Sequence, residues 1–211
     1  GTNRIRPKIV ASTATVRRAE RQIVALFARR RVELFPPASP IREDSFFART
    51  ASPDERAPRE YLGIAAPGRS IKVLMLRTYV ALLAASYKAF MDAGGDGTNA
   101  NPADPYLTVL GYFNALRELG GARRIVEDEV NSRVKVYGQR KRVGETTGLF
   151  ADREIEYEVL ELTSRVPTSD VARAKRRLER PWRIATKGDR VDLALATNMI
   201  SVGLDITRLG L

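Results

Sequence analysis

The chain has 211 residues, of which 44% are hydrophobic, so it is long and apolar enough for one large domain or two small ones with a sizeable core. Its 36 Lys and Arg residues outnumber 25 Asp and Glu residues, and the net charge of +11 suits a polyanion such as nucleic acid, although the soluble surface of an Arg-rich proteome would give the same balance. The chain has neither cysteine nor histidine, which excludes disulfides, zinc fingers and Cys or His nucleophiles within it and fits a cytoplasmic protein.

The first 60 residues predict a strand, a helix and a linker. Residues 7–12 form a short β-branched run, and from about Val16 to Arg30 apolar residues recur at helical spacing among arginines. Residues 36–60 are rich in Pro, Ser, Asp and Arg, which is typical of a linker or long loop. We therefore expect one domain to end within residues 1–35 and a second to occupy residues 61–211.

Beyond residue 60, apolar runs that predict strands alternate with stretches of helical periodicity. The most apolar stretch, residues 71–91, carries three basic residues and therefore predicts a buried helix rather than a membrane span. The alternation predicts an α/β fold, with a mostly parallel sheet and helices on both of its faces. The predicted strands cover residues 61–67, 106–113, 157–162 and 191–196, and the predicted helices cover about 70–93 and 114–130 and a segment capped by Thr168 or Ser169.

Polar side chains follow three of the predicted strands. In a parallel sheet the carboxyl ends of the strands share one edge, where ligands bind. Hydroxyl and amide groups at helix N-termini suit phosphate oxygens, because free backbone amides add donors there. Alternatively, each residue is only a helix cap or turn residue, but equivalent positions in successive strand–helix units favour phosphate binding. The predicted nucleic-acid-binding residues at this edge are Asn114, Thr163, Ser164, Thr197 and Asn198.

A basic insertion is predicted at about residues 133–148, which have no helical stripe and suggest an exposed loop or irregular hairpin. Arg140, Lys141 and Arg142 could neutralise phosphates there, and Tyr137 could stack on a base. A loose solvated loop is the alternative, and the sequence balances the two interpretations. For Trp182, packing is favoured over a role as a base platform.

Four segments resemble helicase motifs, in the order in which helicases carry them. Ser12–Thr15 resembles the Ser/Thr-Ala-Thr of motif III, and Thr108–Ala122 resembles motif IV and its helix. Glu161–Asp170 resembles a strand, loop and helix that touch the nucleic-acid backbone, and Ala196–Ile206 resembles motif V. The ordered set is similar to superfamily 2 helicases. Over nearly the whole chain, from PKIVASTAT to ATNMISVGLDITRLGL, the sequence further resembles the helicase component of DISARM anti-phage systems and related bacterial helicases.

The resemblance implies a RecA-like fold, in which residues 1–35 end the first RecA-like domain and residues 61–211 form most of the second, truncated after motif V. Thr13, Ala14 and Thr15 would couple the nucleotide state to the grip on nucleic acid. Gly203 and Asp205 would approach the nucleotide, with Asp205 near the ribose. The residues at the carboxyl edge would contact the backbone of the tracking strand.

The complete protein would, by this resemblance, be an ATP-dependent helicase or translocase that uses Mg²⁺, acts on DNA rather than RNA and serves in anti-phage defence. Its expected partners are nucleic acid, the first RecA-like domain of the same protein and other defence-system subunits, with no membrane involved.

Several parts of that machinery do not occur in this sequence. It contains no G-x-x-x-x-G-K-[ST] phosphate loop, no Asp-Glu pair stands before the motif III segment, and the chain stops before an Arg-rich motif VI. We therefore expect no catalytic residue, no bound metal or nucleotide and no ATP hydrolysis by this chain alone. The alternatives are a non-catalytic nucleic-acid-binding or assembly module with a RecA-like fold, and a sugar-nucleotide enzyme in which Gly203 and Asp205 hold a ribose; the basic excess and the Thr-Ala-Thr segment count against the latter.

Overall fold

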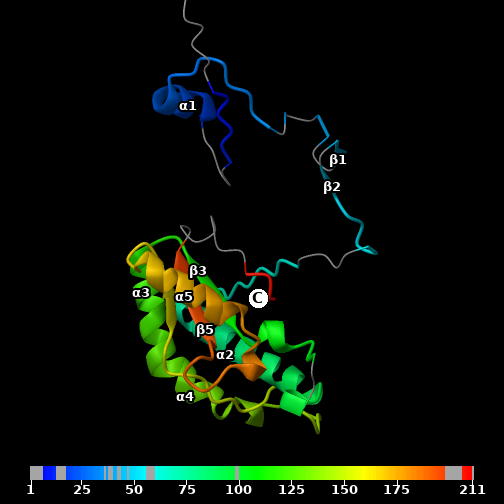
Figure 1. Ribbon diagram of the computed structural model, residues 1–211. Coiled ribbons are helices and arrows are strands. Elements are labelled where there is room, and N and C mark those ends of the chain that lie inside the picture. The colour runs from blue at the N-terminus through cyan, green and yellow to red at the C-terminus, as the bar shows by residue number, and fades with distance from the viewer. Residues whose placement is uncertain are drawn as a thin grey trace, which may run out of the picture. The chain divides into compact units, whose positions relative to one another are not determined.

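The computed structural model describes residues 7–12, 18–35, 37, 40–41, 44–46, 48–55, 60–97, 100–197 and 206–210. The chain divides into two compact units, Gly1–Ile64 and Ala65–Leu211, whose elements are labelled in Figure 1. Among the described residues, every buried apolar side chain except that of Ala19 belongs to the second unit. The second unit therefore holds the hydrophobic core.

The first unit contains a short helix and a small hairpin. Helix α1 spans Ala19–Phe27. It is shorter than the predicted helix because Arg18 and Ala28, on either side, have left-handed backbone conformations with φ of 57° and 51°. The hairpin pairs β1 (Asp44–Ser45) antiparallel with β2 (Ala48–Arg49).

Two of the predicted strands are wrong. Residues 7–12 and 61–67 have no strand conformation, and Tyr61 and Leu62 are each 84% exposed. An apolar run becomes a strand only beside another strand that takes up its backbone hydrogen bonds. Neither run has such a neighbour among the residues that the structure describes.

The core of the second unit is a parallel sheet. In the described part of the chain it has three strands, β3 (Val109–Phe113), β4 (Leu160–Leu162) and β5 (Leu193–Thr197), in the order β3-β5-β4. Both pairings are parallel. The predicted α/β arrangement is thereby confirmed, and it is consistent with a RecA-like domain.

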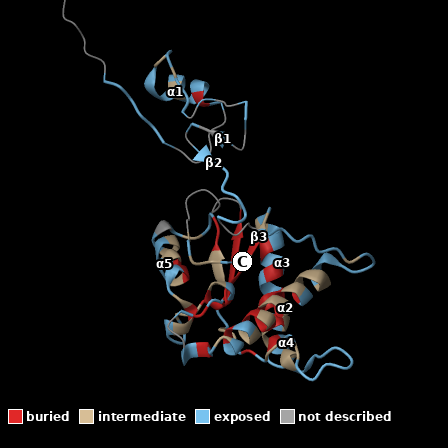
Figure 2. Ribbon diagram, turned by 90° about the vertical axis from the view of Figure 1, so that its right-hand side faces the viewer, coloured by how far each residue is buried: buried red, intermediate tan, exposed pale blue. Residues whose placement is uncertain are grey.

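Helices cover both faces of this sheet. Figure 2 shows α5 on one side and α2, α3 and α4 on the other. The central strand β5 packs Leu193 and Leu195 into the cluster with α2 and α3, while Ala194 and Ala196 pack against α5. This alternation follows from the two-residue period of a strand, and it explains why β5 is buried along its whole length.

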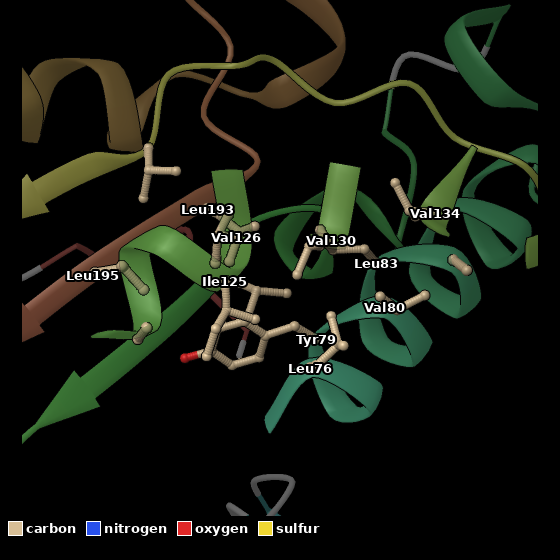
Figure 3. Close-up of a cluster of buried hydrophobic side chains, with 14 of the residues drawn as sticks. Leu76, Tyr79, Val80, Leu83, Ile125, Val126, Val130, Val134, Leu193 and Leu195 are labelled. Atoms are coloured by element: carbon tan, nitrogen blue, oxygen red, sulfur yellow. The ribbon is translucent and has the colours of Figure 1, made fainter. Parts of the chain in front are cut away.

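Helix α2 spans Ile71–Asp92, as predicted, and Ser70 caps it by accepting a hydrogen bond from the amide of Val73. Among the described helices, α2 alone is long and apolar enough to cross a membrane, and 33% of its most apolar window is buried. Figure 3 shows its apolar side chains, from Leu76 to Leu83, facing Ile125, Val126 and Val130, with Leu193 and Leu195 of β5 beside them. Core packing thus accounts for its apolar sequence.

The next helical run begins just after β3. Helix α3 (Leu116–Ile125) continues through a π-helical turn (Val126–Val130) into α4 (Asn131–Val134). The run ends four residues beyond the predicted helix, and Gly120 and Gly121 do not interrupt it. Because it starts at the carboxyl end of β3 and packs antiparallel to the strand, it carries the chain away from that edge.

Helix α5 spans Thr168–Glu179. Its N-cap is Pro167, so the predicted cap at Thr168 or Ser169 is wrong by one or two positions. Strand β4 begins at Leu160, three residues later than predicted, and the amide of Glu156, just before the predicted start, donates to the carboxylate of Asp192. Short 3₁₀ turns cover Gly95–Gly97, Asp104–Tyr106, Tyr137–Gln139 and Trp182–Ile184.

Candidate nucleic-acid interface at the carboxyl edge of the sheet

The carboxyl ends of the three strands meet at one edge of the sheet. Phe113, the last residue of β3, pairs with Thr197 of β5, and Leu162 of β4 pairs with Ala196. This register places four of the predicted binding residues at the same edge, because each of them ends or follows a strand. They are Asn114, Thr163, Ser164 and Thr197.

Thr163 and Ser164 occupy the turn between β4 and α5 in different ways. Thr163 is 3% exposed, and its hydroxyl donates to Oε1 of Glu161 at 2.7 Å and accepts from the amide of Arg165 at 3.3 Å. Its side chain therefore builds the turn, as the cap-or-turn alternative expects. Ser164 is exposed at the tip of that turn and is the better placed of the two to contact a ligand.

Asn114 lies in the exposed connection between β3 and α3. The N-cap of α3 is Ala115, which makes no side-chain capping hydrogen bond. The first turn of this helix therefore presents amide donors beside Asn114. Thr197, at the end of the central strand, is 7% exposed and lies next to Phe113 in the register.

The other residues assigned to this machinery lie outside the described part of the chain. They are Asn198 of the predicted backbone contacts, the nucleotide residues Gly203 and Asp205, and the coupling residues Thr13, Ala14 and Thr15. Within the described residues, no group of three or more Asp, Glu, His or Cys side chains could hold a metal ion.

The basic insertion lies at the opposite edge of the sheet. The α3–α4 run takes the chain away from the carboxyl ends as far as Val134, whose carbonyl accepts from the amide of Arg153. Arg153 in turn contacts Leu107 and Asp192, which precede β3 and β5. The structure thus separates Arg140, Lys141 and Arg142 from the four residues at the carboxyl edge.

Within the insertion, the charged side chains already contact neighbours. The guanidinium of Arg140 lies 4.7 Å from the centre of the Tyr137 ring, whose edge packs on Phe150. Lys141 donates to the carbonyl of Thr146 at 3.0 Å. Tyr137 is therefore half-buried between its neighbours rather than an open platform for a base.

A buried ion pair that the sequence did not reveal joins the segments at the amino edge. The side chains of Arg153 and Asp192 are 1% and 2% exposed and pair directly. Burial is the largest cause that lowers the pKa of Arg153, and the charge of Asp192 opposes it. Asp192 also accepts from the indole of Trp182 at 2.9 Å, so Trp182 has the packing role that was expected of it.

A second ion pair fixes the last described segment, 206–210, at the same edge. Arg208 donates to Asp104 at 3.2 Å, to the hydroxyl of Thr108 at 2.9 Å and to the carbonyl of Leu178 at 2.7 Å. Burial lowers the pKa of Arg208, and Asp104 opposes the shift. The segment that resembles motif V therefore starts at the carboxyl edge with Ala196, while the residues after it are held at the amino edge.

Two hollows of about 430 and 480 Å³ flank the outer strand β4. Acidic residues outnumber basic ones in their walls. In the first, Glu127, Glu156 and Glu158 accompany Arg123, and in the second, Glu158, Glu161, Asp170 and Asp189 accompany Arg123, Arg173 and Arg177. Carboxylates repel phosphates, so these hollows do not suit a nucleic-acid backbone.

The fold and this edge define a parallel α/β unit whose strand ends present hydroxyl, amide and helix N-terminal donors. No protein-family model matches the chain. Over all 211 residues it is 38% identical to the DISARM protein DrmA of Bacillus paralicheniformis. The match covers 18% of that protein, so the chain spans about a fifth of the curated relative. The similarity supports the resemblance to a DISARM protein that the sequence indicated.

Proposed function

We propose that the chain is part of a nucleic-acid helicase or translocase that acts in DISARM-type anti-phage defence. Within the complete protein, this chain would bind the backbone of a DNA strand at the carboxyl edge of the sheet. The similarity to DrmA supports the defence role. The order of the helicase-like segments supports the motor.

One observation carries the binding role. Asn114 and Ser164 lie in the connections that follow β3 and β4, Thr197 is the last residue of β5, and the parallel register brings these three positions to a single edge. Neutral donors combined with helix N-terminal amides hold phosphates without reading bases. A translocase needs this kind of contact, because it must move along any sequence.

ATP with Mg²⁺, bound by the complete protein, would supply the energy for movement. Gly203 would let the main chain approach the nucleotide closely, and Asp205 would accept hydrogen bonds from ribose hydroxyls. This chain would then form half of the cleft, and the first RecA-like domain would form the other half. Closing and reopening of the cleft would move the DNA-backbone-binding sites of the two domains relative to each other. Other defence-system subunits are proposed as partners, in the cytoplasm.

The test is the binding of a fluorescently labelled single-stranded DNA, measured by anisotropy. Ser164→Ala and Asn114→Ala are each expected to raise Kd about threefold to tenfold, because each removes a hydrogen bond worth about 0.5–1.5 kcal/mol. Ser132→Ala is the matched control, since Ser132 is an exposed serine on α4, at the far end of the α3–α4 run. Unchanged affinity in both test variants, or no binding by the wild-type chain, contradicts the proposal.

A non-catalytic binding or assembly module would pass that test as well. In that case the longer protein would bind DNA with the same affinity whether or not ATP is present. A motor requires affinity to depend on the nucleotide, so an ATP-dependent change in Kd of the longer protein favours the proposed function.

A further inference from the structure

The two hollows beside β4 join into one groove along the outer edge of the sheet. They share four lining residues, which are Arg123, Glu158, Val159 and Gly188. Between them they border six consecutive residues, 156–161, which we name the β4 groove together with the side chains around it. Val159 packs into the cluster with α2 and α3, whereas Leu160 packs against the cluster with α5. A hollow that borders both of these neighbours therefore lies along the edge of the strand.

Helices from both faces of the sheet stand beside the β4 groove. Arg123 belongs to α3, while Arg173 and Arg177 belong to α5, and all three line the second hollow. Figure 2 shows that α3 and α5 cover opposite faces. Side chains from the two faces can meet in one hollow only at the edge of the sheet. The β4 groove therefore lies where a further strand would extend the sheet, about 4.8 Å from β4.

Strand β4 is free to pair on this side. In the described part of the chain, β4 pairs with β5 alone, and residues 157–159 take part in no backbone–backbone hydrogen bond. An edge strand presents N–H and C=O groups to which an extended peptide can add as another strand. Six residues in extended conformation span about 20 Å, which is the length of a typical strand. The β4 groove thus offers main-chain hydrogen bonds to a segment of about six residues.

The walls of the β4 groove carry an excess of negative charge. Glu158 already pairs with Arg177 at 3.1 Å, but Glu156 has no cationic partner among the described residues, and its carboxylate accepts from the amide of Gly188 at 3.0 Å. A segment that carries lysine or arginine would neutralise the excess. The six acidic residues are Glu127, Glu156, Glu158, Glu161, Asp170 and Asp189, and the three basic ones are Arg123, Arg173 and Arg177.

An exposed aromatic ring adds a contact for the same kind of side chain. Tyr157 is 71% exposed, lines the first hollow and lies between Glu156 and Glu158 in the sequence. A lysine or arginine is attracted both by the face of an aromatic ring and by carboxylates. Tyrosine is also among the residues that contribute most to protein–protein binding. This end of the β4 groove is therefore suited to a basic side chain of a bound segment.

We propose that the β4 groove binds an extended segment of another protein subunit, which carries lysine or arginine and adds to the sheet as a further strand beside β4. An acidic segment would be repelled by the excess of carboxylates. Pairing with the same edge of a second copy would bring two such sets of carboxylates together, which is also unfavourable. Neither Asn114 nor Ser164, the proposed DNA contacts, lines the groove, so the two surfaces are distinct.

The test measures the fluorescence anisotropy of a labelled peptide of four lysine–valine repeats as the chain is added. Because the chain has a net charge of +11, non-specific attraction works against this probe. The wild-type chain is expected to bind it, and to bind a peptide of four glutamate–valine repeats at least tenfold more weakly. A lysine–valine peptide methylated at every backbone nitrogen is expected to lose at least about fivefold in affinity, because it cannot donate to the strand edge.

The variant Glu156→Gln/Glu158→Gln keeps the shape of both side chains and removes their charge. Its Kd for the lysine–valine peptide is expected to rise about 2- to 30-fold, because two exposed charge pairs with the peptide are lost. The matched control is Glu118→Gln/Glu129→Gln, which removes the same charge elsewhere and is expected to stay within about twofold of the wild type.

The control matches the variant in its ion pairs. Glu129 pairs with Arg133, as Glu158 pairs with Arg177, and Glu118 is exposed without a cationic partner among the described residues. An equal loss in the control, or equal binding of the methylated or the glutamate–valine peptide, overturns the inference. So does a wild-type chain that does not bind the lysine–valine peptide. A wild-type dimer in sedimentation that this peptide dissociates would show that a second copy, rather than another subunit, occupies the groove, and would overturn the assigned partner.

Discussion

Asp192 binds two other segments of the chain at the amino edge, residues 153–156 and the turn at Trp182. Its carboxylate accepts from Arg153, from the Trp182 indole and from the amide of Glu156. The guanidinium of Arg153 also donates to the carbonyls of Leu83 and Leu107, so one buried pair ties α2 and the starts of two strands together. Charges this deeply buried are stable only as a complete set, because each alone would face a large desolvation cost.

Replacement of Asp192 by Asn is therefore expected to destabilise the protein by about 3–5 kcal/mol. The substitution keeps the shape of the side chain but leaves Arg153 charged and unpaired in the core. Urea-induced unfolding, followed by circular dichroism, measures the loss. Asp189→Asn breaks the half-exposed pair with Arg180 and serves as the control, with an expected loss below about 1 kcal/mol.

If Asp192→Asn does not fold well enough for a urea titration, the double variant Arg153→Met/Asp192→Asn decides the matter. Removing the unpaired cation is expected to recover part of the lost stability. A single variant as stable as the wild type, or a double variant less stable than the single one, would contradict the role assigned to this pair.

Tyr79 links the protonation of one side chain to stability at high pH. Burial against β3 raises the pKa of its phenol from 10.0 to about 12. The folded state thus holds the proton more tightly than the unfolded state does. Its contribution is fully present below about pH 10 and is lost as the pH rises towards 12, by about 1.4 kcal/mol per pH unit and about 3 kcal/mol in all.

Tyr79→Phe is expected to flatten the fall in the free energy of unfolding between about pH 10 and about pH 12, because phenylalanine has no proton to lose. Tyr112→Phe is the control, since Tyr112 lies on β3 but is 52% exposed. Equal alkaline sensitivity of the wild type and Tyr79→Phe, measured by thermal melts across this pH range, would refute the assignment.

At the scale of elements, the two faces of β5 carry side chains of different size. The face towards α2 and α3 carries Leu193 and Leu195, and the face towards α5 carries Ala194 and Ala196. On the other face, α2 approaches β3 at Gly111, where an added Cβ would lie 2.2 Å from the Tyr79 hydroxyl.

Local sequence was sufficient to predict an element where the sequence contains its capping residue, its terminating residues and its apolar periodicity. Helix α2 has a serine cap and an apolar pattern over six turns, and its bounds were predicted to within a residue or two. The apolar runs at residues 7–12 and 61–67 carry β-propensity but no partner, and pairing is not a local property. Strand β4 begins three residues later than predicted, and the segment before it bonds to Asp192, which lies more than 30 residues away in the sequence.

The positions of the candidate site residues were predictable from the sequence, but their hydrogen bonds were not. Alternation of strands and helices was enough to place Asn114, Ser164 and Thr197 at one edge, because parallel strands align their carboxyl ends. Two other features of the site were not predictable from the sequence. The hydroxyl of Thr163 bonds within its own turn, and the basic insertion lies at the opposite edge of the sheet. Asp192, an aspartate in the apolar run 191–196, was the one signal of a buried partner, and it did not identify Arg153.

On the scale of the whole second unit, acidic and basic side chains lie close together around β4 and α5. The walls of the hollows beside β4 hold more acidic than basic residues, and Asp170 and Arg173 of α5 both line the second hollow. The net charge of +11 belongs to the whole chain, and 13 of its 36 basic residues lie in residues 1–64, outside this unit.

The sequence motifs of the chain also bear on whether it can hydrolyse ATP. Phosphoryl transfer requires a phosphate-binding lysine, a Mg²⁺ ligand, a group that positions water and an arginine finger within one cleft. The chain has ample arginine but no phosphate-loop sequence, so the proposed DNA-binding residues occur in it without the loop that would hold the transferred phosphate. Holding DNA and hydrolysing ATP are thus expected to be separable in this protein.

The last prediction follows from that separation. The purified chain is expected to release phosphate from ATP no faster than a no-protein control, with or without single-stranded DNA, under conditions in which it binds that DNA. Asp205→Ala distinguishes a trace of contaminating ATPase from the activity of the chain itself, because a contaminant would leave the rate unchanged in the variant. A DNA-stimulated rate that scales with the concentration of the chain and falls in Asp205→Ala would show that this chain hydrolyses ATP by itself, and the division of labour proposed for it would be wrong.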